Sequence, residues 1–202
     1  IKHFAEKNIE LISEIEFAYR YCKGKIIAIT GSNGKTTTTN LCYHMLHTNG
    51  YHVAKVGNVG YSFARSLALT DHDYYVLELS SFQLDTISEF RPDVAIIINI
   101  TPDHLDRYDY IFENYIKSKF RITLNQKSED LLILNSNDQT IRKYLGIVPI
   151  NAKVDWLEVR LNEEEDVIVN NERLVSLKNS GLKGNHNAFN AGCAARAAHF
   201  MG

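Results

Sequence analysis

The stretch Thr30-Gly31-Ser32-Asn33-Gly34-Lys35-Thr36-Thr37 directly follows the apolar run 25–29. Glycines leave no Cβ in the way, so the backbone N–H groups of residues 31–37 can converge on phosphate oxygens. A helix expected over residues 35–48 would aim its free N–H groups and its positive dipole end at the same anion. Lys35 can reach terminal phosphates, and the Thr36 hydroxyl can bind Mg²⁺. The stretch therefore predicts a strand, a phosphate-binding loop (P-loop) and a helix, in that order.

This loop is shorter than the usual P-loop, in which four residues separate the first glycine from Gly-Lys-Ser/Thr. That first glycine would fall on Ile29, so the chain has the form Gly-x-x-Gly-Lys-Thr instead. The shortened spacing disfavours a generic P-loop NTPase or kinase. The other alternative is an ordinary strand-to-helix turn with a solvated Lys35. It is disfavoured because the strand, the glycines, Lys35, Thr36 and the helix all agree on one site.

The composition describes a protein with one sizeable core and no strongly charged surface. The chain has 202 residues and a formal net charge of −2, which gives no reason to expect a nucleic-acid partner. We recognise no signal peptide and no apolar run of membrane length, and so expect no membrane partner. The cysteines Cys22, Cys42 and Cys193 are widely spaced, which is typical of reduced thiols in a cytoplasmic protein. We expect no obligate protein partner.

Continuous apolar runs predict an α/β fold. Runs such as Val94–Ile98 indicate strands covered on both faces, hence a mostly parallel sheet with helices on both faces. After Pro149 the pattern alternates, and Asn170-Asn171 sits where a tight hairpin turn would go, which predicts a small antiparallel sheet over about 154–177. The other strands are expected at 25–30, 52–56, 74–79, 94–98 and 131–134, and the helices at 13–22 (opened by a Ser-x-x-Glu capping box), 35–48, 62–68, 110–125, 138–144 and 186–201.

Two polar positions follow strands at the edge of the sheet where ligands gather in α/β proteins. Glu78 ends an apolar strand and is either a turn-capping group or a Mg²⁺ ligand, and its place opposite the P-loop favours the metal. His104 follows the strand at 94–98. It is either a ligand or donor near the phosphates, or a surface residue next to a helix cap at Asp103.

Two further helices carry candidate groups. From the residues alone, Lys119 is one more solvated cation on a helix face, between Lys117 and Arg121. Asn187 and Asn190 are three residues apart and share a helix face. They either cap and pack the start of the last helix or donate hydrogen bonds to a ligand such as a nucleotide base, and residue chemistry does not separate the two.

Five spaced motifs can be quoted in order: the P-loop at 30–37, Glu78-Leu79-Ser80-Ser81-Phe82-Gln83-Leu84, Asn99-Ile100-Thr101-Pro102-Asp103-His104-Leu105-Asp106-Arg107-Tyr108, Tyr115-Ile116-Lys117-Ser118-Lys119-Phe120-Arg121-Ile122 and Gly184-Asn185-His186-Asn187. Together they resemble the Mur ligase family. The run at 78–84 is the most discriminating and resembles the D-glutamate-adding branch. The resemblance covers nearly all of the chain, and it corresponds to the central, ATP-binding domain of that family.

The resemblance implies a nucleotide and metal site. Gly31, Ser32, Asn33, Gly34, Lys35, Thr36 and Thr37 would hold the phosphates of ATP, and Asn187 and Asn190 would contact the nucleotide. Thr36 and Glu78 would hold one Mg²⁺, and His104 would help to hold a second. Lys119 matches a lysine that carries a carbamate in this family, which would turn a cation into a metal-binding anion.

The implied activity is an ATP-dependent amide ligation. D-glutamate would be joined to UDP-N-acetylmuramoyl-L-alanine through an acyl phosphate, in peptidoglycan precursor synthesis. Lys35, His104 and Lys119 would act in catalysis, whereas Asn58, Ser80 and Gln83 match positions near the muramoyl-peptide substrate. One alternative is a ligase like folylpolyglutamate synthase, against which the run 80–83 argues. The other is an ATP-binding module without catalysis of its own.

The resemblance also implies a division of the chain. Residues 1–22 would be the end of a preceding domain or a linker, and residues 23–202 would be the central domain, which in this family carries the small antiparallel sheet. Flanking domains outside this sequence would help to bind the uridine diphosphate group and D-glutamate, and the domain that brings D-glutamate would complete the nucleotide site. We therefore expect the isolated segment to be inactive as a ligase.

Overall fold

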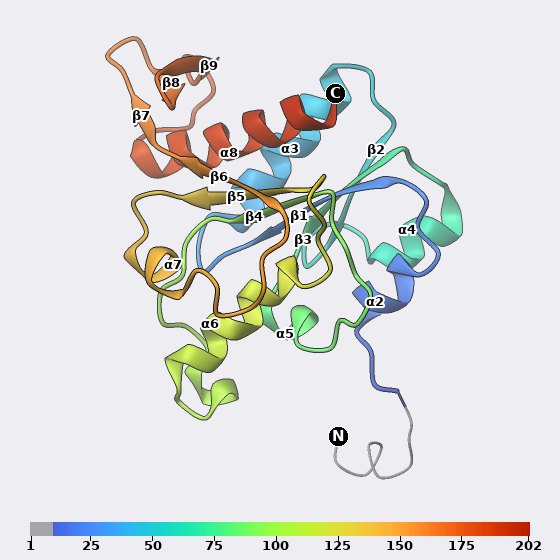
Figure 1. Cartoon of the computed structure of the whole chain (residues 1–202). Helices are drawn as coiled ribbons and strands as arrows, with labels where there is room; N and C mark the ends of the chain where they lie inside the picture. The colour runs from blue at the N-terminus through green and yellow to red at the C-terminus, as the bar shows by residue number, and fades with distance from the viewer. Residues whose placement is uncertain (1–9) are drawn as a thin grey trace.

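A parallel sheet of six strands lies at the centre of the molecule (Figure 1). The structure is a computed structural model, and it describes residues 10–202. The strand order is β2-β3-β1-β4-β5-β6, and every neighbouring pair is parallel. The strands are β1 (Lys25–Thr30), β2 (Val53–Gly57), β3 (Tyr74–Glu78), β4 (Val94–Ile97), β5 (Leu131–Asn135) and β6 (Lys153–Leu157). The predicted mostly parallel sheet is confirmed.

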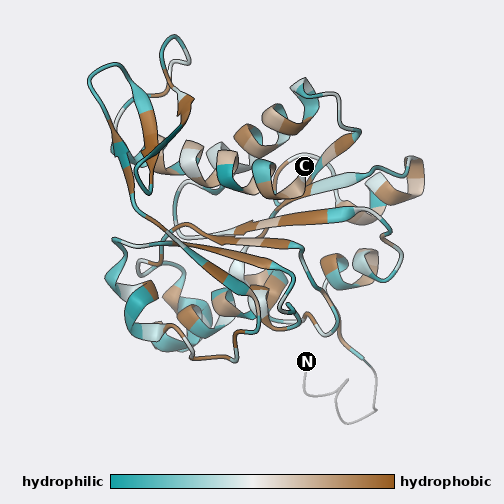
Figure 2. Ribbon diagram, turned by 45° about the horizontal axis from the view of Figure 1, so that its top comes forward, coloured by the Kyte–Doolittle hydropathy of each residue, from teal (hydrophilic) through white to brown (hydrophobic). Residues whose placement is uncertain are grey.

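Helices cover both faces of this sheet because its central strands are apolar on both sides. In β1, Ile26 and Ala28 belong to one core, while Ile27 and Ile29 belong to the other. Figure 2 shows these strands as a brown layer between the helices. The helices α3 (Lys35–Thr48) and α8 (Asn185–Met201) lie side by side on one face, and the other face carries α2 (Glu14–Tyr19), α4 (Phe63–Leu69), α5 (Ser81–Leu84), α6 (Phe112–Phe120) and α7 (Gln139–Tyr144). No helix within residues 10–202 is both long and apolar enough to cross a membrane.

A second, antiparallel sheet contains β7 (Val159–Leu161), β8 (Asp166–Val169) and β9 (Glu172–Ser176). The predicted hairpin is confirmed, since Asn170 and Asn171 join β8 to β9 with φ angles of 49° and 72°. This small sheet packs on α8 at Gly192, where an added Cβ would lie 3.0 Å from Val169 and 3.1 Å from Val159. The small sheet is thereby fixed over one end of α8.

The expected start of the small sheet at 154 was wrong. Residues 153–157 form β6, which pairs in parallel with β5 at the edge of the main sheet. An edge strand is covered less completely than a central one. The residues Val154, Asp155 and Trp156 alternate between apolar and polar like a strand of an antiparallel sheet, although burial in β6 rises gradually from the exposed Val154 to the buried Leu157. The pattern alone could not distinguish the two.

The helix predicted at 110–125 is shorter than expected. It begins at Phe112, because Asp109 and Tyr110 have φ angles of 55° and 57°, and it ends at Phe120. A 3-10 turn over Arg121–Thr123 follows it, and another 3-10 turn over Leu105–Tyr108 and the short helix α5 were not foreseen. These single-turn elements follow β3, β4 and α6, and they lie in or beside the motifs at 78–84, 99–108 and 115–122.

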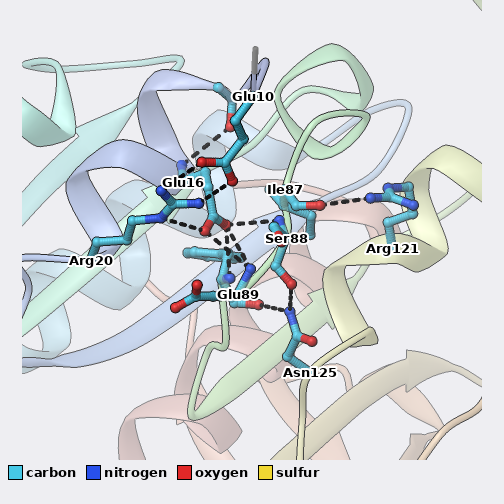
Figure 3. Close-up of polar contacts among 10 residues, drawn as sticks. Glu10, Glu16, Arg20, Ile87, Ser88, Glu89, Arg121 and Asn125 are labelled. Carbon is cyan, nitrogen blue, oxygen red and sulfur yellow. Dashed lines mark hydrogen bonds and ion pairs between the residues drawn. The ribbon is translucent and has the colours of Figure 1, made fainter. Parts of the chain in front are cut away.

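The helix α2 is anchored to the loop before β4 by a buried carboxylate (Figure 3). Glu16 accepts hydrogen bonds from the backbone N–H groups of Ser88, Glu89 and Phe90 at 2.9–3.0 Å and from Arg20 Nε at 3.2 Å. Burial alone would raise the pKa of the Glu16 carboxyl, but these donors outweigh it and hold the pKa below its ordinary value. The expected capping box forms only in part, since Ser13 Oγ accepts the Glu16 N–H while the Glu16 side chain is used elsewhere.

This anchoring bears on the expected division of the chain. Residues 1–9 lie outside the described part, so the expectation for them is not addressed. Ile15 and Ala18 of α2, however, are buried in the same core as β1 and β3. The segment 14–19 is therefore an integral part of this folded unit, whereas we expected the unit to begin at residue 23.

Candidate active site

The candidate site lies where the carboxyl ends of three neighbouring strands meet. β1 lies between β3 and β4 in the sheet. The P-loop therefore leaves β1 next to Glu78, which ends β3, and next to the segment 98–104, which follows β4. Ligands of open α/β sheets bind at this edge. Residues that are far apart in the sequence are thereby brought together, as the sequence predicted.

The P-loop leads into α3 through Gly34, which has a φ of 85° and precedes the first helical residue. No hydrogen bond within residues 10–202 uses the backbone N–H groups of residues 34–37. The first N–H groups of a helix carry a partial positive charge and bind anions readily. The start of α3 therefore offers four adjacent donors to a phosphate.

Two lysines converge on a single carbonyl of this loop. Lys35 Nζ and Lys119 Nζ each donate a hydrogen bond of 2.8 Å to Gly31 O, and Lys35 also donates to Ser32 O at 2.9 Å. Lys119 is only 2% exposed, and its Nζ lies 4.6 Å from the centre of the Tyr115 ring. Lys119, which the residues alone placed on a solvated helix face, is therefore buried inside the site.

Burial lowers the pKa of both amines. Burial, and then the neighbouring Lys35 charge, lower the pKa of Lys119 to about 7, although Asp103 opposes the shift. Burial also lowers the pKa of Lys35, while Glu78 and Asp103 oppose that shift. A large share of Lys119 is therefore a neutral, nucleophilic amine near neutral pH.

Thr36 and Glu78 form the part of the site whose chemistry suits a metal ion. Thr36 Oγ1 donates to Glu78 Oε2 at 2.8 Å, and Asn58 Nδ2 donates to Glu78 Oε1 at 2.8 Å. Glu78 is 2% exposed. Mg²⁺ takes oxygen ligands and is commonly bound through one or two carboxylates together with water and phosphate. The pair therefore fits Mg²⁺. Residues 10–202 contain no cluster of three or more His, Cys, Asp or Glu side chains suited to a metal.

A small cavity of about 170 Å³ collects most of the predicted substrate and catalytic residues. Its walls include Lys35, Asn58, Ser80, His104 and Lys119. The His104 side chain is 57% exposed and packs edge-on against Phe82, with 5.4 Å between the two ring centres. The backbone φ of His104 is 49°. Gln83 is not part of the wall. Its Oε1 accepts hydrogen bonds from the N–H and the hydroxyl of Ser80, so the pair caps the start of α5.

A larger cavity of about 580 Å³ lies on the other side of the P-loop. It is bounded by the P-loop at Asn33 and Gly34, by the start of α8, by β7 and by the ends of β4 and β5. Asn190 lines it and is 4% exposed, and its side chain lies against Gly34. Asn187 does not line it, because its Nδ2 donates to Lys183 O at 3.0 Å. The structure thus places Asn190 at the cavity and uses Asn187 at the helix start.

Two residues at this edge had no role assigned from the sequence. The Asn99 side chain hydrogen-bonds to the P-loop, and the Tyr115 hydroxyl lies 3.2 Å from Ser32 Oγ while its ring faces Lys119. Both carried a usable signal. Asn99 comes immediately after a buried strand, and Tyr115 precedes Lys119 by one helical turn.

Comparison with known proteins is consistent with this geometry. Residues 29–198 match the family described as Mur ligase middle domain. The chain is 44% identical over 211 residues to the UDP-N-acetylmuramoylalanine--D-glutamate ligase of Bacteroides fragilis, covering 100% of this chain and 48% of that protein. The protein of the same name from Cytophaga hutchinsonii is 44% identical over 219 residues, again covering 100% and 48%. The chain therefore belongs to the Mur ligase family, and it spans about half the length of the curated relatives it matches.

Solved structures share the fold at low sequence identity. The UDP-N-acetylmuramate:L-alanyl-gamma-D-glutamyl-meso-diaminopimelate ligase of Neisseria meningitides superimposes with a TM-score of 0.72 at 19% identity, covering 100% of this chain and 69% of that one. The MurF ligase of Thermotoga maritima, in complex with ADP, gives 0.68 at 20% identity, covering 93% and 48%. The Escherichia coli FolC protein, also with ADP, gives 0.62 at 16%, covering 95% and 59%. At these identities the likeness concerns the fold alone.

The fit of Asn190 against the P-loop can be tested at Gly34. A Cβ at this position would lie 2.6 Å from Asn190 Oδ1, and the backbone φ is +85°. We expect Gly34→Ala to lower the free energy of unfolding by roughly 2–3 kcal/mol. The strain of an alanine with a left-handed backbone contributes about half of this loss. Chemical denaturation followed by circular dichroism measures this change. Gly146→Ala is the matched control, because Gly146 has a φ of +88° and nothing within 4 Å of its Cβ position.

The added variant Asn190→Ala separates the clash from the strain. In the double variant Gly34→Ala/Asn190→Ala the cost of the alanine at 34 should fall to that of Gly146→Ala. Equal costs for Gly34→Ala and Gly146→Ala in the presence of Asn190 would contradict the contact between Asn190 and the loop.

Proposed function

We propose that this chain is the ATP-binding part of an ATP-dependent ligase that joins D-glutamate to UDP-N-acetylmuramoyl-L-alanine in the cytoplasm. The observation that carries the proposal is the meeting of three features at one edge of the sheet. These are the four free N–H groups of residues 34–37, the Thr36–Glu78 pair and the buried Lys119. The names of relatives at 44% identity over the whole chain support the choice of substrates.

In this proposal the nucleotide spans the two cavities. The N–H groups at the start of α3 and the Lys35 ammonium would bind the β- and γ-phosphates, and the base would enter the larger cavity beside Asn190. Thr36 and Glu78 would hold Mg²⁺, with His104 and carbamylated Lys119 at a second ion. Mg²⁺ would supply neutralisation of charge on the phosphate oxygens. The acceptor carboxylate would lie in the small cavity lined by Asn58 and Ser80.

The reaction needs positioning and positive charge more than a protein nucleophile. The L-alanyl carboxylate would attack the γ-phosphorus of ATP, the bond to the β–γ bridging oxygen would break, and ADP would leave. The amine of D-glutamate would then attack the acyl-phosphate carbon, lose a proton and expel inorganic phosphate. Two anions must approach each other in the first step. Lys35 and the helix N-terminus would offset their repulsion and stabilise the charge that moves between them.

The activity is tested in the natural polypeptide that contains this chain. We expect ADP release to require UDP-N-acetylmuramoyl-L-alanine, D-glutamate and Mg²⁺ together. Lys35→Ala should lower the rate by roughly ten- to hundredfold, as expected for the loss of hydrogen bonds to a charged group. Lys117→Ala is the control, because Lys117 pairs with Glu113 on the exposed side of the same helix as Lys119. A coupled assay for ADP measures both.

Two outcomes would contradict the proposal. Full activity of Lys35→Ala would show that the loop is not the phosphate site. ADP release that depends on a folate and L-glutamate, and not on the muramoyl substrate, would instead indicate a ligase like FolC.

Carbamylation of Lys119 gives a separate prediction with a defined pH dependence. Only the neutral amine reacts with CO₂, and the pKa of Lys119 is lowered to about 7. The neutral fraction rises as the pH passes upward through this value. In ¹³C-bicarbonate, a carbamate resonance should therefore be weak near about pH 6 and grow toward about pH 8, a range centred on that pKa. Nuclear magnetic resonance with ¹³C detection measures the signal.

The variants Lys119→Arg and Lys117→Ala provide the contrast. Lys119→Arg should abolish the resonance, and Lys117→Ala should keep it. A resonance that survives in Lys119→Arg would rule out this lysine as the modified group.

A further inference from the structure

The side chain of Asn99 closes the P-loop from outside. Its Oδ1 accepts hydrogen bonds from the backbone N–H groups of Ser32 at 3.1 Å and Asn33 at 2.9 Å, while its Nδ2 donates to Asn33 O at 3.0 Å. The amide thus satisfies both a donor and an acceptor of the loop in a single plane. An amide is the side-chain group that can accept and donate in this way, whereas a carboxylate can only accept.

The backbone of the segment 98–101 continues the same contact. Ile98 N donates to Thr30 O at 3.1 Å, and Ser32 N donates to Asn99 O at 3.0 Å. Thr101 N donates to Ser32 Oγ at 3.0 Å, and that hydroxyl donates to Thr101 O at 2.9 Å. These hydrogen bonds therefore join the loop to the segment that follows β4, beyond the last paired residues of the sheet.

A glycine makes this close approach possible. A Cβ at Gly31 would lie 3.2 Å from Ile98 Cβ and 3.4 Å from both Asn99 N and Asn99 O. A side chain at 31 would therefore require Ile98 or the loop to shift slightly. Gly31 therefore serves the contact with the segment 98–101 as well as the turn itself.

The contact divides the N–H groups of the loop into two sets. Those of Ser32 and Asn33 donate hydrogen bonds to Asn99. Those of residues 34–37 have no partner within residues 10–202. Of the loop positions expected to bind phosphate, the backbone of 32 and 33 is therefore occupied inside the protein.

We propose that Asn99 is a positioning residue for nucleotide binding, which clamps the P-loop so that the N–H groups of residues 34–37 are fixed in a phosphate-binding arrangement before ATP arrives. This inference rests on the proposed function, since it concerns the same nucleotide site. The shortened loop lacks the extra residues with which a longer P-loop wraps a phosphate. Asn99, which follows a neighbouring strand, supplies hydrogen bonds that order the loop. The loop therefore loses its conformational entropy during folding rather than on binding.

The test compares three forms of the natural polypeptide that contains this chain by calorimetry with ATP and Mg²⁺, after circular dichroism has shown that each is folded. Asn99→Ala should raise the Kd for ATP roughly tenfold, as expected when the three side-chain hydrogen bonds that order the loop are lost. Asn125→Ala is the matched control. Its amide also makes two hydrogen bonds to backbone carbonyls, those of Ser88 and Phe90, in a loop that lines neither cavity.

A purely structural role would lower the melting temperature of both variants and change the Kd of neither. A positioning role changes the Kd only in Asn99→Ala. An unchanged Kd in Asn99→Ala, with tight binding by the unsubstituted chain, would overturn this inference and leave the proposed function intact.

A second measurement tests the contact between Asn99 and the loop in the absence of nucleotide. Amide hydrogen exchange of Ser32 and Asn33 in the nucleotide-free chain should be slow, and it should accelerate in Asn99→Ala but not in Asn125→Ala. If the folded natural polypeptide binds no ATP, the proposed function fails, and fast exchange at both amides in the unsubstituted protein would overturn the clamp.

Discussion

The hydrogen bonds that join residues 30–33 to residues 98–101 are the constraint on which the rest of the site depends. β1 and β4 are neighbours in a parallel sheet, so the segments that leave them run side by side. This contact sets the direction in which α3 begins, and hence where its free N–H groups point. It also places the Gly31 carbonyl where both Lys35 and Lys119 can reach it. The helix start, the metal-suited pair and the buried lysine then follow from one local geometry.

The meeting of two lysine amines at one backbone carbonyl gives the site its electrostatic character. Either lysine alone could be neutralised by a nearby carboxylate, but the only direct partners of both Nζ atoms within residues 10–202 are neutral backbone oxygens. The Lys35 ammonium and the charged fraction of Lys119 are therefore held inside the site without a bonded counter-ion. An incoming phosphate would supply the missing negative charge, which is the arrangement that favours anion binding. Burial, and then the neighbouring Lys35 charge, also lower the pKa of Lys119, which makes its amine reactive.

Much of the fold could be predicted because central strands buried on both faces leave an unmistakable apolar pattern. The start of β6 could not, since an edge strand of a parallel sheet alternates like an antiparallel one. The P-loop and Glu78 were predicted to lie together, because strand ends in a parallel sheet meet. Which of Asn187 and Asn190 faces the cavity depends on the rotation of α8, which their shared helix face does not fix. Lys119 is buried only because α6 packs beneath the loop, a tertiary effect with no local signal.

The most direct test of this account is the structure of the chain bound to Mg²⁺ and a non-hydrolysable ATP analogue. The account predicts phosphate oxygens within hydrogen-bond distance of the N–H groups of residues 34–37, with the Asn99 contacts to Ser32 and Asn33 unchanged. Lys35 Nζ should have left Gly31 O for a phosphate, and the base should lie beside Asn190. A loop that has released Asn99 to wrap the phosphates, or a nucleotide bound outside the larger cavity, would contradict it.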